Sequence, residues 1–84
     1  MNIENVLIEL RIPAAQASCD MFIPRATMIY DVVQLIKAGV SDMYEGEYFP
    51  SDDTFLCDET GRPLDINMRV EDAGIKNGTC LMLI

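Results

Sequence analysis

The chain has 84 residues, half of them hydrophobic, and its 14 acidic and 6 basic residues give a net charge of −8. This length supports one core, so we expect a single domain, residues 1–84. The acidic balance argues against a nucleic-acid partner, and the lack of histidine removes the commonest metal ligand and general base, which disfavours an enzyme or a metal site.

The three cysteines, Cys19, Cys57 and Cys80, lack the CxxC spacing of a zinc or redox site. An odd number of cysteines is typical of reduced thiols that pack as small hydrophobic side chains. No apolar run approaches the roughly 20 residues that span a bilayer, and the N-terminus lacks the basic start of a signal peptide. We therefore expect a cytoplasmic protein without a cofactor or a membrane-inserted segment.

The first part of the chain alternates between apolar and polar residues, the period-2 pattern of strands that bury one face. Residues 6–12 place their even-numbered apolar side chains on one face, and residues 19–23 direct Cys19 and its odd-numbered neighbours inward. Pro13 and the small residues up to position 18 are typical of a turn. The pattern predicts two strands joined by a hairpin.

From Met28 the hydrophobic period changes to 3.6, which predicts one amphipathic helix. The residues assigned to its buried face are Ile29, Val32, Val33, Ile36, Val40 and Met43. Thr27 is placed to accept the free amide hydrogens of the first turn. We expect the helix to end near Tyr44, with Gly46 in the left-handed conformation.

An acidic segment without any cation, residues 45–53, follows the helix. Its simplest interpretation is a solvated loop, and the alternative is a docking loop that uses Tyr48 and Phe49. The role of this loop is left open. The carboxylate pairs nearby, at 52–53 and 58–59, lie on adjacent residues that diverge, so they predict neither a catalytic pair nor a metal site.

Residues 54–57 predict a third strand in which Phe55 and Cys57 face inward and Leu56 faces outward. The segment 62–65 is expected at a sheet edge, because Pro63 cannot donate to a central ladder.

The last fifteen residues predict a helical turn that ends at Gly74 with positive φ, a turn at Asn77-Gly78, and a final strand with Leu81 and Leu83 inward. Pairing the first strand beside the last would bury the helix face most economically.

This order of elements resembles the β-grasp, and Val70-x-Asp72-x-Gly74-Ile75 followed by Asn77-Gly78 resembles the closing part of ubiquitin-like proteins. With the opening Val-Leu-Ile-Glu-Leu-Arg and the short hairpin, the chain is most similar to the YukD/EsaB group, small bacterial ubiquitin-like proteins associated with type VII secretion. The resemblance implies an α+β fold, a mixed four- to five-stranded sheet packed on one main helix. It also implies a noncatalytic adaptor or regulator that binds a protein, either a membrane-embedded secretion component or an ATPase.

Two alternatives stay open beside this interpretation. One is a ubiquitin-like modifier or sulfur carrier, which is disfavoured because the sequence ends Leu-Met-Leu-Ile without Gly-Gly. The other is a homodimer in which a second copy covers the apolar face or an edge strand.

The face of the sheet that points away from the helix is the expected partner-binding surface, as it is in the ubiquitin-like domains that the chain resembles. The residues assigned to it are Leu7, Leu56, Cys80, Met82 and Ile84, with Leu56 and Met82 at its centre. A contiguous exposed apolar patch usually marks an interaction site, and the alternative is a set of scattered surface side chains. Cys80 is the thiol expected to react with a reagent, but no thiol has a base beside it.

Overall fold

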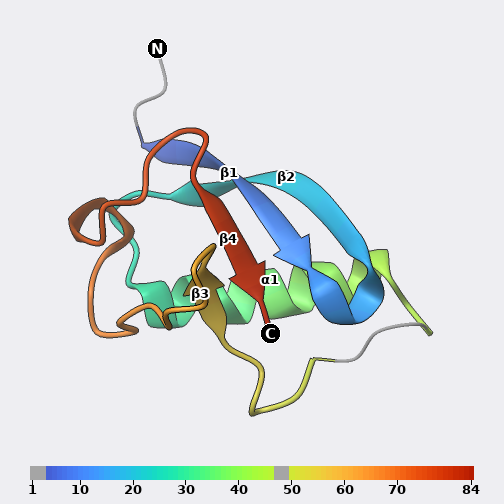
Figure 1. Ribbon diagram of the computed structural model, residues 1–84. Coiled ribbons are helices and arrows are strands. Elements are labelled where there is room, and N and C mark those ends of the chain that lie inside the picture. The colour runs from blue at the N-terminus through green and yellow to red at the C-terminus, as the bar shows by residue number, and fades with distance from the viewer. Residues whose placement is uncertain (1–3, 47–49) are drawn as a thin grey trace.

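A computed structural model describes residues 4–46 and 50–84. Four strands form one sheet in the order β2-β1-β4-β3, and a single helix packs against one of its faces (Figure 1). The elements in chain order are β1 (Asn5–Ile12), a 3-10 turn (Pro13–Ala15), β2 (Ala17–Pro24), α1 (Ile29–Met43), β3 (Leu56–Asp58), a second 3-10 turn (Val70–Asp72) and β4 (Cys80–Leu83). The predicted mixed sheet on one main helix is confirmed.

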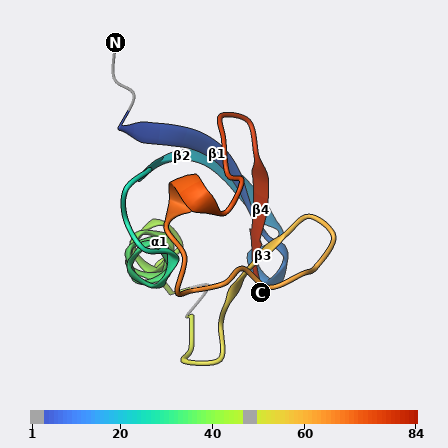
Figure 2. The same cartoon turned by 90° about the vertical axis from the view of Figure 1, so that its left-hand side faces the viewer.

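The core lies between α1 and the sheet, which curves over one side of the helix when viewed along the helix axis (Figure 2). Alternate residues of the strands and one stripe of the helix supply it, as their periodicities predict. Its members from these elements include Val6, Ile8, Leu10 and Ile12 of β1, Ile23 of β2, Ile29, Val32, Val33, Ile36 and Val40 of α1, Leu56 of β3, and Leu81 and Leu83 of β4.

The first and last strands lie side by side in the middle of the sheet, as expected, and the structure shows that they run parallel. The Gly78 N–H donates to the Leu7 carbonyl over 2.8 Å, and the Glu9 N–H donates to the Thr79 carbonyl over 3.0 Å. The Leu7 N–H donates to the Asn77 side-chain oxygen over 2.9 Å. The Asn77 side chain therefore extends the hydrogen-bonded ladder beyond the first residue of β4.

The edge beside β3 is covered by the segment that contains Pro63. The Leu64 N–H donates to the Leu56 carbonyl over 3.0 Å, and the Asp58 N–H donates to the Arg62 carbonyl over 2.9 Å. Only an isolated bridge between Cys57 and Pro63 marks a fifth strand. The predicted edge position of this segment is confirmed.

The prediction that Thr27 caps the helix is wrong. The N-cap is Met28, and no side chain donates to or accepts from the cap. Instead, the Ile29 N–H donates to the Met68 carbonyl over 2.8 Å, and the Tyr30 N–H donates to the Ile66 carbonyl over 3.1 Å. Backbone carbonyls from a distant loop thus satisfy the first turn, which needs acceptors for its free N–H groups.

The C-terminal end of the helix matches the prediction more closely. The helix ends at Met43, and Gly46 has a φ of 83°, in the left-handed region. Met43, however, is exposed rather than buried, because it lies in the last turn, past the end of the packed face. No helix among the described residues is long and apolar enough to cross a membrane.

The predicted orientation of the third strand is also wrong. Leu56 is only 3% exposed and lies opposite Leu83 on the side of α1, whereas Phe55 is 41% exposed. Cys57 points away from α1 but is buried too, beside the Pro63 bridge. Consecutive apolar residues gave no alternation, so the pairing with β4 decides which face each side chain takes.

This orientation predicts different costs for two neighbouring substitutions. Leu56→Ala should lower the free energy of unfolding by about 2–5 kcal/mol, because it leaves a cavity in the core. Phe55→Ala, the matched control, should cost about 1 kcal/mol or less, as exposed positions do. Urea unfolding followed by circular dichroism measures both, and equal losses would contradict the orientation of β3.

Candidate protein-binding face

The face of the sheet opposite α1 carries the exposed side chains of the central strands. The parallel register sets Glu9 beside Cys80 and Arg11 beside Met82, and all four residues alternate with core residues of the same strands. Leu7 precedes them on β1 and is partly exposed. The structure therefore places Leu7, Cys80 and Met82 on the predicted face.

Ile84 and Phe55 extend this face towards the edge at β3. Their backbones exchange two hydrogen bonds of 2.9 Å, so the two residues lie directly opposite each other. Both side chains are exposed, Ile84 by 49%. We call the apolar group of Leu7, Cys80, Met82 and Ile84 the sheet-face patch. Phe55 lies at its border, at the sheet edge, where it also lines a pocket with Tyr30 and Lys37 of α1.

The assignment of Leu56 to the centre of this face is corrected by the structure, because its side chain belongs to the core. The position expected to be exposed is taken by Phe55, which the sequence analysis placed inward. The exposure of Phe55 follows from its position opposite Ile84. That position depends on the register of two segments far apart in the chain, which the local sequence does not contain.

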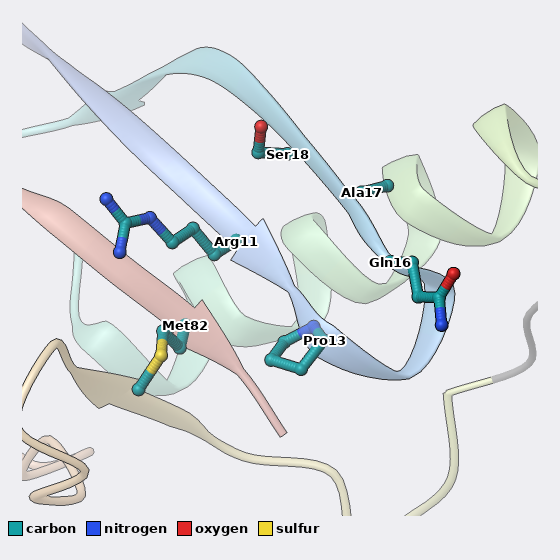
Figure 3. A pocket seen from close by; sticks show the side chains of 6 residues that line it. All are labelled: Arg11, Pro13, Gln16, Ala17, Ser18 and Met82. Carbon is teal, nitrogen blue, oxygen red and sulfur yellow. The ribbon is translucent and has the colours of Figure 1, made fainter.

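A single ion pair borders the patch. The Arg11 Nε lies 3.1 Å from a Glu9 carboxylate oxygen, and both side chains are exposed. This hydrogen bond raises the pKa of the Arg11 guanidinium. Figure 3 shows Arg11 and Met82 on the same side of the sheet, in a shallow hollow completed by Pro13, Gln16, Ala17 and Ser18 at the hairpin end. The hollow is thus mainly apolar, with one cation at its rim.

The three thiols differ in their access to solvent. Cys57 is buried, whereas Cys19 and Cys80 are partly exposed. Burial raises the pKa of all three thiols, and Arg11 opposes this rise at Cys80. A raised pKa lowers the fraction of nucleophilic thiolate, which is the reverse of what a catalytic cysteine needs. Residues 4–46 and 50–84 hold no group of three His, Cys, Asp or Glu side chains that would bind a metal ion.

Asp58 belongs to the 58–59 carboxylate pair considered above for catalysis or metal binding. Its carboxylate has a structural role in its own turn. It accepts hydrogen bonds from the Thr60 hydroxyl over 2.6 Å, from the Thr60 N–H over 2.9 Å and from the Arg62 N–H over 3.0 Å. These bonds lower the pKa of Asp58, and the bond from the Thr60 hydroxyl has the largest effect. The carboxylate holds the loop that covers the β3 edge beside the patch.

The alternative docking loop contains Tyr48 and Phe49. Tyr48 and Phe49 lie outside the described residues. Their role in docking stays a prediction.

The order of the elements and the mixed sheet on one helix give the chain the ubiquitin-like β-grasp fold. No family model matches the sequence, and no curated protein matches it. Solved structures do match. The ubiquitin-like domain of the type VII secretion protein EccD1 of Mycobacterium tuberculosis superposes with a TM-score of 0.77 at 18% identity, over 95% of this chain and 97% of that one.

Two further structures extend this likeness. The EccD5 ubiquitin-like domain of Mycobacterium xenopi gives a TM-score of 0.83 at 15% identity, over 95% of this chain and 92% of that one. A chain of the MycP5-free ESX-5 inner membrane complex gives 0.73 at 10% identity, and 96% of this chain matches 21% of it. At these identities the likeness establishes the shared fold.

The burial of the thiols predicts an order of chemical labelling. Iodoacetamide on the native protein should modify Cys19 and Cys80 well before Cys57, because only opening of the 62–65 segment exposes the latter. Mass spectrometry of peptides from timed, quenched samples measures the order. Labelling of Cys57 at the rate of Cys80 would show that its cover is absent in solution, and labelling in denaturant provides the unprotected reference.

The Asp58 turn predicts a stability difference that depends on pH. Asp58→Asn should lower the free energy of unfolding at neutral pH, because the ionised carboxylate stabilises the fold above its ordinary pKa of 3.8. That stabilisation disappears as the pH falls through the lower pKa of the folded state, so the two proteins should converge in acid. Urea unfolding of both from neutral to about pH 2 tests this. A gap independent of pH would contradict the proposed role of the charge.

Proposed function

We propose that this domain is a noncatalytic adaptor or regulator of a type VII secretion system that binds a protein partner through the sheet-face patch. In this proposal it is a cytosolic accessory protein of the YukD/EsaB kind. The observation that carries it is the likeness to the EccD1 and EccD5 ubiquitin-like domains. This likeness extends over nearly the full length of this chain and of each of those domains. The likeness to a chain of an inner membrane complex supports a partner embedded in the membrane, and an ATPase is the alternative partner.

The composition of the patch suits protein binding rather than chemistry. Its apolar side chains follow one face of β1 and β4, with Ile84 exposed and Leu7, Cys80 and Met82 partly exposed, and apolar surface of this kind marks interaction sites. Burying about 400 Å² of apolar surface there would contribute about 10 kcal/mol, before the costs of association. Met82 adds an adaptable surface, because a flexible thioether packs against differently shaped partners.

The ion pair beside the patch would orient a bound partner. Arg11 and Glu9 are exposed, so their interaction contributes little to stability and leaves both groups accessible to a partner. A partner that places a carboxylate near Arg11 would fix its orientation over the neighbouring apolar residues. Charged groups at a rim act mainly on specificity and association rate.

Aspartate at the centre of the patch should abolish capture of the partner. We expect Met82→Asp to reduce recovery at least about tenfold, because a carboxylate would be buried without a counter-charge. The measurement is co-purification of the tagged protein from cells that carry a type VII secretion system, with bound proteins identified by mass spectrometry. Unchanged recovery of secretion components by Met82→Asp, or their absence from the wild-type sample, would refute the proposal.

Met43→Asp is the matched control, since it makes the same substitution at an exposed position in the last turn of α1, away from the pockets that Met82 and Phe55 line. It should retain the partner, and thermal unfolding should show both variants folded. Light scattering at low concentration distinguishes a free patch from one covered by a second copy.

A further inference from the structure

A small groove lies between α1 and the segments on either side of β3. Its volume is about 220 Å³, and the buried side chains of Val33 and Leu56 form its floor. Three exposed apolar side chains surround this floor, with exposed fractions of 54% for Tyr30, 41% for Phe55 and 46% for Ile66. They are three of the seven large hydrophobic side chains that are exposed among the described residues, so apolar surface is concentrated here. We call this site the helix–β3 groove.

Hydrogen bonds hold both ends of the helix–β3 groove in place. At one end, the Tyr30 N–H donates to the Ile66 carbonyl over 3.1 Å, where the chain runs from β3 to the start of α1 (Figure 2). At the other end, the Lys37 ammonium donates to the Ser51 carbonyl over 3.0 Å. Tyr30 and Lys37 lie seven positions apart on α1, so the groove between them is roughly 10 Å long.

The turn that Lys37 contacts is ordered by its own hydrogen bonds. The Ser51 N–H donates to the Thr54 hydroxyl over 2.9 Å, and the Thr54 N–H donates to the Ser51 carbonyl over 3.1 Å. Phe55 follows directly, and its backbone is paired with that of Ile84. The wall that carries Phe55 is therefore fixed before a ligand binds, which lowers the entropy cost of binding.

Carboxylates stand on every element that borders the groove. The exposed carboxylates in its lining or next to it are Asp31 of α1, Asp52 and Asp53 before β3, and Asp65 after β3. None of the four forms an ion pair within residues 4–46 and 50–84. Lys37 is the only cation among the described lining residues, and its ammonium already donates to the Ser51 carbonyl. In a chain with a net charge of −8, these surroundings favour a cationic ligand.

We propose that the helix–β3 groove binds an aromatic side chain of a partner protein, with Lys or Arg on both sides of it in the partner's sequence. The ring packs on the buried floor, and Tyr30 and Phe55 contact it in the offset or edge-to-face geometry of aromatic pairs. The groove is smaller than the roughly 300 Å³ at which pockets for drug-sized ligands begin, so it holds one side chain. Three extended residues span about 10 Å, so the flanking cations reach Asp52 at one end and Asp65 at the other.

A second copy of the chain does not supply such a segment. None of the six aromatic residues in the sequence has a Lys or Arg beside it. Joining two copies here would also bring together two chains that each carry a charge of −8. A cationic segment of another protein has neither disadvantage.

The helix–β3 groove borders the sheet-face patch at Phe55, but the two sites have different linings. None of the four patch residues lines the groove, and Met82 lines a separate hollow at the hairpin end. The proposal therefore does not rest on the proposed function, and failure of one leaves the other standing.

The test is a titration of the ¹⁵N-labelled protein with the peptide acetyl-Arg-Trp-Arg-amide, followed by NMR. We expect saturable shifts of the Tyr30, Lys37 and Ile66 amides, with a dissociation constant of about 1 mM or lower. Binding should weaken with added salt, because the flanking cations contribute to it. The same peptide with Ala in place of Trp, or with Glu in place of both Arg residues, should bind at least about tenfold more weakly.

Two pairs of variants separate the groove from the rest of the surface. Ile66→Ser should raise the dissociation constant roughly fivefold, since it removes an apolar wall. Leu35→Ser, which changes an exposed residue of α1 in a different groove towards β2, should leave it unchanged. Asp52→Lys should weaken binding and reduce its salt dependence, whereas Asp42→Lys, the same change of charge outside the groove, should do neither.

Several results would overturn the proposal. They are the absence of saturable shifts at about 10 mM peptide, equal binding of the Ala peptide, and shifts confined to Cys80 and Met82, which would assign the peptide to the sheet-face patch. Shifts of the Tyr30 and Ile66 amides that follow protein concentration without peptide would assign the groove to a second copy instead.

Discussion

The parallel pairing of β1 with β4 is the constraint on which the rest of the structure depends. It joins residues about seventy positions apart, as the hydrogen bond from the Leu7 N–H to Asn77 illustrates. Such long-range pairing is costly in chain entropy, and it is stabilised only when both strands bury apolar side chains against α1. Once the pairing forms, β4 provides the template that orients β3.

The same pairing gives the two faces of the sheet different environments. One face of the central strands is buried in the core against α1, and the opposite face carries the sheet-face patch. The two sheet edges are also unequal, because the loop that Asp58 holds covers β3, whereas no segment of residues 4–46 and 50–84 pairs with the outer side of β2. In the part of the chain that the structure describes, no buried side-chain nitrogen or oxygen lacks a hydrogen-bond partner.

Sequence reasoning succeeded where periodicity was strong. β1, β2, α1 and β4 each have several repeats of one period, and Leu7, Cys80, Met82 and Ile84 on the open face follow directly from that alternation. It failed at β3, whose apolar run carries no period, so that Leu56 and Phe55 exchanged places. A strand of three residues takes its orientation from its neighbour, and the sequence of the strand itself does not contain that information.

Other features depended on tertiary neighbours from the start. Leu35 falls outside the buried stripe of α1, and only the position of β2 turns it into the wall of a groove. The cap of the helix was missed for a similar reason, because Ile66 and Met68 supply carbonyls from a segment with no local capping signal.

This distant cap has a consequence for how the chain opens. Besides the Ile66 and Met68 carbonyls, the Val70 N–H donates to the Thr27 carbonyl over 3.0 Å, and the Glu71 N–H donates to the Arg25 carbonyl over 2.9 Å. The start of α1 and the segment from Ile66 to Glu71 are therefore one cooperative unit. Fraying of that helix end requires the late segment to detach, and a nascent chain on the ribosome completes the helix start only after that segment has emerged.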